Sequence, residues 1–511
     1  RDVLGSRGLG DVYKRQRDRL LTITASNDII RIKKIKIVGI KVNIMKKPIR
    51  FYISVIGAKL IIKLMRIMRR NATNLPGEIA LIFYPQLLKY FEMPDTVIAV
   101  TGTNGKTTVS NLIGEILGKN GFDLISNSFG GNVDTGIASI LLDNCTLSGK
   151  FKKNTALFEM DERSAPRVLP YLRPDWLVCT NLQRDSMKRN AHPEFIFRIL
   201  NENMPEKTKL ILNGDDLISG RLAPENKRSY FGISKLKYET PTEDNIICDI
   251  SDCPECGSKL DFEFRHYNHI GRAVCRRCGF STPEIDYDMT SDEHDTAVIM
   301  HNGKPEKYRL LNKRITDYYN VTAAVAFCRE FGLSEQQVAD SLNGMNIVKS
   351  RYDNFEACGK EVIVSLAKGQ NPVACSGVCD FIRREPGKKA VIMILEDLYD
   401  SKRTSENIAW IYETDFEFLK GNGVEQIIVG GKRASDYIVR LLLAGVEKEK
   451  IFTCTDEKET VKLLIPENID KIMIMYDLFN VESLNSIKSQ LMQMKIGDGY
   501  ENSRNIIPGN L

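Results

Sequence analysis

The sequence predicts an α/β protein with two sheet-containing domains, and three observations lead to this fold class. From Thr96 onward, short apolar strands alternate with helices, which favours a parallel sheet covered by helices. One of these strands, TVIAVTG, runs directly into the glycine-rich segment TGTNGKTT, which opens a helix. A second series of apolar strands, among them KAVIMILED, VEQIIVGG and KIMIMYD, follows a boundary near residues 345–360.

The size and composition of the chain limit the classes of protein to consider. Its 511 residues suffice for two to four domains, and 42% hydrophobic with 27% charged residues fits a globular protein. A net charge of +6 is too small for a dedicated nucleic-acid binder. We find no signal-peptide pattern and no run of 18 uncharged apolar residues, so we expect a cytoplasmic protein.

The first part of the chain differs from the rest. It opens RDVLGSRGLGDVYKRQRDRL, lacks hydrophobic periodicity, and has its first methionine at Met45. We expect residues 1–44 to be a non-native or disordered extension. Residues 45–92 should form a helical segment, because IRFYISVIGAKLIIKLMRIMRR has apolar residues at helical spacing among Lys and Arg. Packing on the next domain is the favoured role of this helix, and contact with a membrane surface is the alternative.

We assign residues 93–345 to a central ATP-binding domain and residues 346–511 to a C-terminal domain. Within the central domain, the strands in KNTALFEMDE, PDWLVCTNL and TKLILNGDD all end in polar residues. Ligands of open α/β sheets gather at the carboxyl ends of the strands, so these polar ends could line one crevice.

The segment TGTNGKTT has the chemistry of a phosphate-binding loop. Glycines allow the backbone to approach an anion, and the following helix directs N–H groups at it. Lys106 can reach the outer phosphates, and Thr107 offers a hydroxyl to Mg²⁺. The usual pattern requires a glycine where this chain has Val100, and Gly102 stands nearby instead. The predicted ATP-binding residues of the loop are Gly102, Thr103, Asn104, Gly105, Lys106, Thr107 and Thr108.

Two C-x-x-C pairs interrupt the central domain at about residues 246–285. Their cysteines, Cys253, Cys256, Cys275 and Cys278, have the spacing of a tetrahedral zinc ribbon. Four thiolates leave no open position for water, so the zinc should be structural. We expect His266 and His269, between the pairs, to lie on the surface rather than to bind the metal. The insert has little basic and aromatic surface, which argues against a nucleic-acid ATPase.

The loop form T-G-T-N-G-K-T-T resembles that of the Mur ligase superfamily, which includes the folylpolyglutamate synthetases. The resemblance implies ATP-dependent amide-bond formation through an acyl phosphate. FEMDE resembles the acidic strand end, which implies that Glu159 holds Mg²⁺ together with Thr107 and, with Lys106, acts in catalysis. DYYNVTAA, KSRYDNFE and SLAKGQNP resemble three further motifs of the superfamily and imply nucleotide-site roles for Asn320, Arg351 and Lys368.

A Cys₄ ribbon inside the ATP domain is similar to the MurT branch of this superfamily, and so are the strings NLPGEIA, RHYNHIG and WIYETDFE. The resemblance implies an α/β fold with a P-loop-type Mur ligase central domain, the zinc insert and the second domain. It further implies a ligase subunit that works with a GatD-like glutaminase. The expected reaction activates the D-glutamate α-carboxyl of lipid II with ATP and Mg²⁺ for amidation by ammonia. The expected location is the cytoplasm, peripheral at the inner face of the membrane, without nucleic acid.

The chain departs from the MurT pattern at three places. Phe129, in NSFGGN, replaces an acid. DYYN stands where the family has a phenylalanine-asparagine pair, so Asp317 changes the polarity near the nucleotide. The position of an aspartate lent to the glutaminase falls on Asn407, with Glu406 or Asp400 as substitutes, of which we favour Glu406. These departures keep two alternatives open: a Mur-type ligase with another carboxylate acceptor, and a non-catalytic scaffold.

Overall fold

The fold is taken from a computed structural model, which describes residues 47–127, 130–185, 192–237, 245–293, 295–310, 314–345, 354–395, 408–421 and 423–494. The account below concerns the compact unit Pro48–Leu511. Among the described helices, none is long and apolar enough to cross a membrane.

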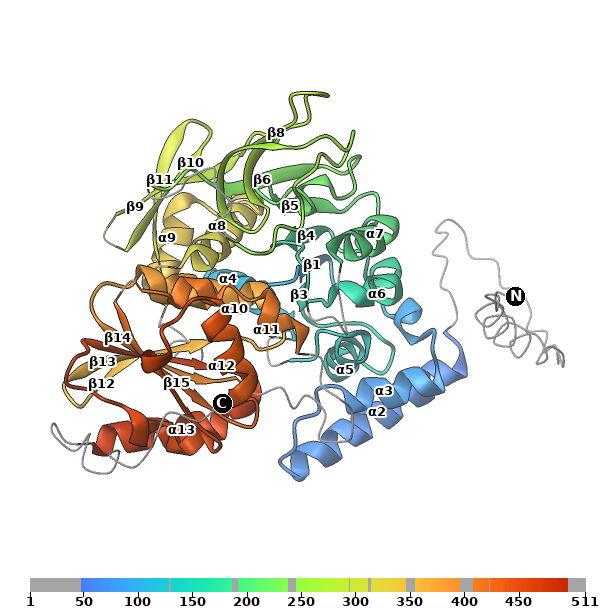
Figure 1. The fold of residues 1–511 in the computed structure, drawn as a ribbon. Coiled ribbons are helices and arrows are strands. Elements are labelled where there is room, and N and C mark those ends of the chain that lie inside the picture. Colours follow the sequence, from blue (N-terminus) through green and yellow to red (C-terminus); the bar gives the residue numbers. More distant parts are fainter. Residues whose placement is uncertain are drawn as a thin grey trace, which may run out of the picture. The chain divides into compact units, whose positions relative to one another are not determined.

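The central domain is built on a nine-stranded sheet with the order β11-β10-β9-β6-β5-β4-β1-β3-β2 (Figure 1). Every pair from β9 to β2 is parallel, as predicted, whereas β10 and β11 extend one edge antiparallel. The strands are β1 (Thr96–Thr101), β2 (Leu124–Ser126), β3 (Thr155–Glu159), β4 (Trp176–Cys179), β5 (Lys209–Asn213), β6 (Arg228–Ile233), β9 (Tyr287–Glu293), β10 (Thr296–His301) and β11 (Lys304–Arg309).

Helices cover both faces of this sheet and create two cores. Along β1, Val97 and Ala99 join one core while Ile98 and Val100 join the other, as the two-residue period of a strand requires. One core contains α5 (Asp134–Asn144), α6 (Ala165–Leu172) and α7 (Pro193–Asn203). The other contains α4 (Lys106–Lys119), α8 (Ile315–Glu330) and α9 (Glu335–Asn343).

The predicted N-terminal helical segment forms α2 (Ile49–Ile67) and α3 (Leu75–Phe83). Phe51, Val55 and Ile62 of α2 are buried in the same core as α5, so this helix packs on the central domain as expected. Short 3₁₀ turns complete the domain at Leu87–Tyr90, Glu162–Ser164 and Ser219–Arg221.

The insert with the cysteine pairs lies between β6 and β9. It contains the antiparallel hairpin of β7 (Asp261–Tyr267) and β8 (Ile270–Val274), which form a separate two-stranded sheet.

The C-terminal domain contains a six-stranded sheet with the order β12-β13-β17-β14-β15-β16, parallel except at β12. The strands are β12 (Asn354–Ala357), β13 (Lys360–Leu366), β14 (Lys389–Ile394), β15 (Val424–Gly430), β16 (Ile451–Cys454) and β17 (Lys471–Tyr476). The helices are α10 (Pro372–Arg384), α11 (Ala409–Glu413), α12 (Ala434–Leu443) and α13 (Val481–Gln493), with 3₁₀ turns at Phe416–Leu419, Lys448–Lys450, Glu457–Leu463 and Leu478–Asn480.

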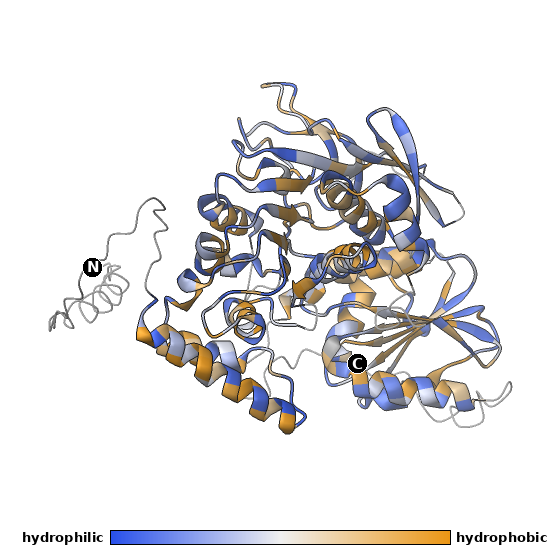
Figure 2. Ribbon diagram, turned by 180° about the vertical axis from the view of Figure 1, so that it is seen from behind, coloured by the Kyte–Doolittle hydropathy of each residue, from blue (hydrophilic) through white to orange (hydrophobic). Residues whose placement is uncertain are grey.

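The hydropathy colouring shows apolar strands in the interior of both sheets (Figure 2). In the C-terminal domain, α10, α11 and α12 share one core, and α13 closes the other face. Each sheet therefore has its own apolar interior, consistent with a second α/β domain. The exact domain boundaries stay a prediction.

Candidate active site

The glycine-rich loop joins β1 to α4, as the sequence predicts. Gly102 and Gly105 adopt φ values of 127° and 85°, which side-chain-bearing residues rarely take. A Cβ atom at Gly102 would overlap Thr180 Oγ1, and one at Gly105 would overlap Asn320 Oδ1. Gly105 is the N-cap of α4, so the first N–H groups of this helix open at the loop. The two glycines are thus required both by backbone conformation and by close neighbours.

The end of β4 holds the loop in place. Thr103 N–H donates to Asn181 O at 2.8 Å, and Asn104 N–H donates to Asn181 Oδ1 at 3.0 Å. Gln183 accepts from Asn104 Nδ2 at 3.1 Å and donates its N–H to Thr103 Oγ1 at 3.0 Å. Sequence reasoning did not assign roles to Asn181 and Gln183, although the polar end of PDWLVCTNL indicated this edge.

Lys106 lies back over the loop and pairs with Glu162. Its Nζ donates to Gly102 O and lies 3.2 Å from Glu162 Oε1. Burial alone would lower the pKa of Lys106, but the neighbouring carboxylates, Glu162 first, outweigh it and raise the pKa. Burial also raises the pKa of Glu162, and Lys106 opposes this only in part. Lys106 therefore carries a positive charge at the loop.

Glu159 ends β3 beside the loop and is buried. Its Oε1 accepts from Asn132 Nδ2 at 2.9 Å, while Asn127 bonds both its N–H and its carbonyl at 2.8 Å. Carboxylate and hydroxyl oxygens are the protein ligands that Mg²⁺ takes, and both Glu159 and Thr107 line the same cavity. The residues present fit the predicted Mg²⁺ site.

A cavity of about 680 Å³ opens over the loop, with walls from both domains. Lys368 Nζ and Asn371 Nδ2, from the C-terminal domain, each lie 3.3 Å from Asn104 Oδ1. Arg314 donates to Ser365 Oγ at 2.6 Å nearby. Six of the seven predicted loop residues line this cavity, all except Gly102, and three further predicted residues join them. The predicted residues in the lining are Thr103, Asn104, Gly105, Lys106, Thr107, Thr108, Glu159, Asn320 and Lys368.

The structure thus brings together most of the predicted site residues. Asn320 and the unusual Asp317 are both buried on α8 and line the cavity. Five residues with predicted roles or departures lie outside the described part of the chain: Phe129, Arg351, Asp400, Glu406 and Asn407.

The four insert cysteines lie together, with all sulfur atoms within 4.8 Å of one another. Cys253 Sγ is 3.5 Å from Cys278 Sγ, and Cys256 Sγ is 3.5 Å from Cys275 Sγ. Tetrahedral zinc with bonds of about 2.3 Å separates its sulfur ligands by about 3.8 Å, so these thiols could hold such an ion.

The two cysteine loops of this cluster have the same backbone hydrogen bonds. Gly257 N–H donates to Cys253 O and Gly279 N–H donates to Cys275 O, both at 2.9 Å. Both glycines have positive φ, at 69° and 80°. Two matched turns thus present their thiols to one point, which is the arrangement that a zinc ribbon needs.

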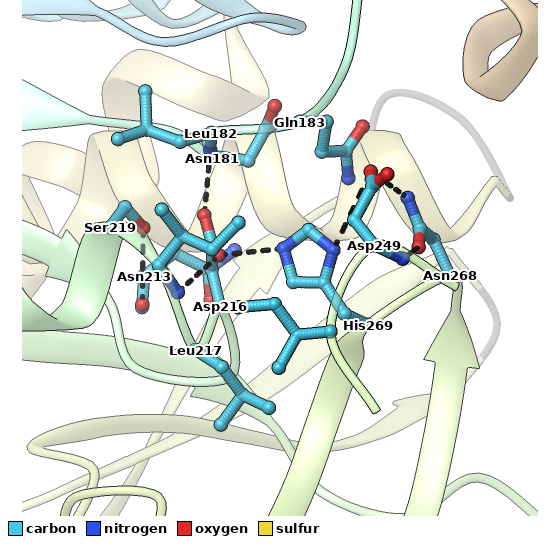
Figure 3. Close-up of polar contacts among 12 residues, drawn as sticks. Asn181, Leu182, Gln183, Asn213, Asp216, Leu217, Ser219, Asp249, Asn268 and His269 are labelled. Atoms are coloured by element: carbon cyan, nitrogen blue, oxygen red, sulfur yellow. Dashed lines mark hydrogen bonds and ion pairs between the residues drawn. The ribbon is translucent and has the colours of Figure 1, made fainter. Parts of the chain in front are cut away.

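The expectation that His266 and His269 lie on the surface is wrong. His269 is fully buried, with Nε2 2.9 Å from Asp216 Oδ1 and Nδ1 3.9 Å from Asp249 Oδ2 (Figure 3). His266 is also buried and its Nε2 lies 3.0 Å from Ile233 O. Both rings anchor the hairpin to the central domain, because Ile233 ends β6 and Asp216 follows β5.

Asp216 links this hairpin to the segment that holds the loop. Its Oδ2 accepts from Leu182 N–H at 2.6 Å, next to Gln183 (Figure 3). Burial alone would raise the pKa of Asp216, but the hydrogen bond and charge of His269 outweigh it and lower the pKa. The polar end of TKLILNGDD thus faces the hairpin and does not line the cavity.

The other side of the hairpin faces the cavity. Arg265, His266, Tyr267 and Asn268 all line it. Asp215 ties this region to α8, since it accepts from Tyr319 OH at 2.8 Å and lies 3.4 Å from Arg272 Nε. The insert is therefore part of the wall of the candidate site.

Comparison with known proteins shows which class of protein has this phosphate loop and this pair of domains. The model of the Mur ligase middle domain matches residues 100–256, and that of the MurT ligase C-terminal domain matches residues 368–478. A pseudomurein peptide ligase type C from Methanothermus fervidus has a similar structure, with a TM-score of 0.60, 20% identity and 80% of each chain covered. The structural likeness shows the fold, and the two family models place the chain among the Mur ligases.

Two relatives are similar over most of the chain. The lipid II isoglutaminyl synthase (glutamine-hydrolyzing) subunit MurT of Staphylococcus aureus (strain COL) is 34% identical, covering 80% of this chain and 91% of its own. The subunit of the same name from Streptococcus pneumoniae (strain ATCC BAA-255 / R6) is 29% identical, covering 78% and 88%. The chain belongs to the MurT family.

Proposed function

We propose that this chain is the ATP-dependent ligase subunit of a lipid II isoglutaminyl synthase. Two observations support the proposal: the relatives named above, and the meeting of Lys106 and Lys368 at one phosphate loop. The meeting of the two lysines is the stronger support for the proposal, because two cations from different domains converge where a triphosphate and a second anionic substrate would lie.

In the proposed first step, an oxygen of the D-glutamate α-carboxylate attacks the γ-phosphorus of ATP. The bond to ADP breaks, and an acyl phosphate forms. In the second step, ammonia attacks the carbonyl carbon, the bond to phosphate breaks, and the departing phosphate takes the proton that nitrogen loses. The product is D-isoglutamine, the α-amide of D-glutamate. Holding the acyl phosphate and ammonia in one enclosed site supplies the proximity that the second step requires.

The chain's own residues bind and orient the reactants. N–H groups of the loop and of α4 hold the phosphates, and Lys106 leaves Glu162 to neutralise charge on the transferred phosphoryl group. Lys368 adds a second cation from the C-terminal domain. Thr107 and Glu159 would hold Mg²⁺, which offsets phosphate charge when bound.

A partner and a location complete the proposal. Ammonia comes from a GatD-like glutaminase subunit, to which Glu406 or Asn407 would lend a side chain. The complex acts in the cytoplasm at the inner face of the membrane, where the lipid-linked acceptor is exposed. The insert holds zinc in a structural role, since four thiolates fill its coordination sphere.

The test is amidation by the reconstituted complex. The full chain is purified with its glutaminase partner and given lipid II, ATP, Mg²⁺ and glutamine, and mass spectrometry follows conversion of glutamate to isoglutamine. We expect amidation by the wild type and none by Lys106→Ala.

Two other outcomes would identify the alternatives. ATP turnover that depends on a different carboxylate, without amidation of lipid II, would point to another acceptor. A wild type indistinguishable from Lys106→Ala in both ATP turnover and amidation would leave the scaffold interpretation.

A further inference from the structure

Helix α2 presents an apolar stripe that is exposed on the side opposite its buried face and that no other described part of the chain covers. Its members recur every three or four residues and so share one helix face. Each is at least 47% exposed, and we call this set the α2 stripe: Ile49, Ile53, Ile56, Leu60, Leu64 and Ile67. The opposite face is buried in the core through Phe51, Val55, Ala58 and Ile62.

The two apolar faces make α2 unusual for a surface helix. A helix with one face on a core normally carries polar residues on the other. Figure 2 shows apolar residues recurring along the whole length of α2. Helix α3 packs against α2 and adds more exposed apolar side chains: Leu75, Ile79, Ile82 and Phe83. Together these residues form an apolar surface that requires an explanation.

Basic residues flank the α2 stripe. Arg50, Lys63, Arg69 and Arg70 are exposed, and α2 contains no acidic residue. Arg66 is directed elsewhere, since it pairs with Asp143 of α5 at 2.7 Å. The acidic residue of α3 is Glu78. The exposed charged residues that α2, the residues after it and α3 contribute beside the apolar surface are therefore mostly basic.

We infer that the α2 stripe docks on the surface of an anionic phospholipid bilayer. Its side chains would enter the boundary between headgroups and acyl chains while the flanking cations meet lipid phosphates. A helix with an apolar face and a basic rim binds in this way, parallel to the membrane plane. The buried face of α2 stays on the protein core, so the helix lies on the bilayer and does not insert across it.

The charges argue against a second copy of the chain as the occupant. A two-fold interface places the same surface on both subunits. Pairing of two α2 stripes would then bring the basic residues of both copies, among them Lys63 and Arg69, to one interface, with no acid on α2 to compensate. An anionic surface removes this repulsion.

The inference deepens the proposed function, because it names the surface that would bring the site to a lipid-linked acceptor. It rests on that proposal only for the identity of the acceptor. Binding to vesicles can be measured without ATP, glutamine or substrate, so the two ideas can fail separately.

The test is flotation of the full chain with vesicles of phosphatidylcholine, alone or mixed with phosphatidylglycerol. We expect binding to the anionic vesicles only, weakened by added salt. Leu60→Glu/Leu64→Glu should reduce binding roughly tenfold or more, because it places two charges in the apolar stripe. Lys63→Glu/Arg69→Glu should also reduce it roughly tenfold or more.

Leu443→Glu on α12 is the matched control, since Leu443 is 68% exposed and Leu60 is 63% exposed. It should bind vesicles like the wild type. All these side chains are exposed, so the variants should keep wild-type circular dichroism and wild-type amidation of a detergent-solubilised substrate.

Several outcomes would overturn the inference. One is a wild type that does not float with anionic vesicles at low salt, and another is equal flotation of wild type and stripe variants. An oligomer that Leu60→Glu/Leu64→Glu dissociates would assign the surface to a second copy. If amidation of detergent-solubilised lipid II fails while vesicle binding holds, the proposed function fails and the membrane inference stands.

Discussion

Lys106 and Glu162 form an ion pair that is nearly inaccessible to water, with side chains 12% and 3% exposed. Such a pair holds the lysine over the loop while no phosphate is bound. It also makes each partner depend on the other, because removing one leaves an uncompensated buried charge. Lys106 should therefore affect stability as well as phosphate binding.

Lys106→Met should abolish ATP turnover and lower the free energy of unfolding by about 3–5 kcal/mol. The folded-state pKa of Glu162 already lies above its ordinary value of 4.5, and loss of the lysine raises it further. A carboxyl with a raised folded pKa binds its proton more tightly in the folded state, so stability falls as pH rises from the unfolded pKa. The loss of unfolding free energy in Lys106→Met, relative to the wild type, should therefore be larger at about pH 8 than at about pH 5. Urea unfolding of both proteins at the two pH values measures this loss.

The double variant Lys106→Met/Glu162→Gln is the control for this prediction. It should regain most of the stability at about pH 8 but none of the ATP turnover, because the buried charge is gone and the phosphate contact is not restored. A double variant as unstable as Lys106→Met would show that the loss comes from packing and not from the charge of Glu162.

His269 fixes a second buried carboxylate, that of Asp216. His269→Ala should lower the free energy of unfolding by about 3 kcal/mol, because Asp216 stays buried without its main partner. The pKa of Asp216 lies below its ordinary value of 3.8, so the wild type keeps this stabilisation above that pH and loses it only in stronger acid.

Asp216 also holds Leu182 next to the loop, so His269→Ala should raise the KM for ATP several-fold. A KM unchanged in a destabilised variant would limit His269 to a structural role.

At the scale of elements, the insert is both a metal cluster and a wall of the cavity. Cys253→Ser should reduce the zinc content of the purified chain, loosen the β7–β8 hairpin and raise the KM for ATP, because Arg265 to Asn268 line the cavity. Metal analysis and ATP titration measure the two effects. Cys454→Ser, in the C-terminal domain and distant from the cluster in sequence, should leave both unchanged. A full zinc content in Cys253→Ser would show that the ligand assignment is wrong.

Elements with local signals were predictable from the sequence. The segment β1–loop–α4 was predictable because an apolar strand, glycines and a helix follow one another directly. The cysteine cluster was predictable because spacing alone constrains four ligands. The antiparallel extension of the sheet by β10 and β11 could not be predicted, because the sequences of these strands resemble those of the parallel strands and only the direction of pairing differs.

Features that depend on distant neighbours escaped prediction. His266 and His269 belong to a polar segment, RHYNHIG, and they are buried against residues distant in the sequence, such as Ile233, Tyr319 and Asp216. Asn181 and Gln183 gave no motif of their own, since their role comes from reaching back to the loop. Glu162, three residues after Glu159, becomes the partner of Lys106 through the turn that follows β3.

At the scale of the whole molecule, polar contacts join the C-terminal domain to the central domain beside the cavity. Arg184 lies 3.2 Å from Glu413, with both side chains partly exposed, so this pair contributes little. Asp415 is buried and accepts from Ile246 N–H at 2.5 Å and Asn245 Nδ2 at 2.9 Å. Its N–H in turn donates to Ser376 Oγ on α10. Asp415 is therefore the stronger of the two links.

Asp415→Ala should weaken the contact between the two domains and so distinguish an effect on kcat from an effect on ATP binding. It leaves the Ile246 N–H and the Asn245 amide without their acceptor, at a cost of about 2 kcal/mol or more. Since Lys368 reaches the loop only while the domains are in contact, kcat should fall more than ATP affinity, because the loop that holds the phosphates lies wholly in the central domain. Glu413→Gln, which alters the exposed link, should leave kcat within about twofold of the wild type. Steady-state kinetics and nucleotide titration of both variants provide the comparison. Equal losses of kcat in the two would mean that Asp415 has no special part in holding the domains together.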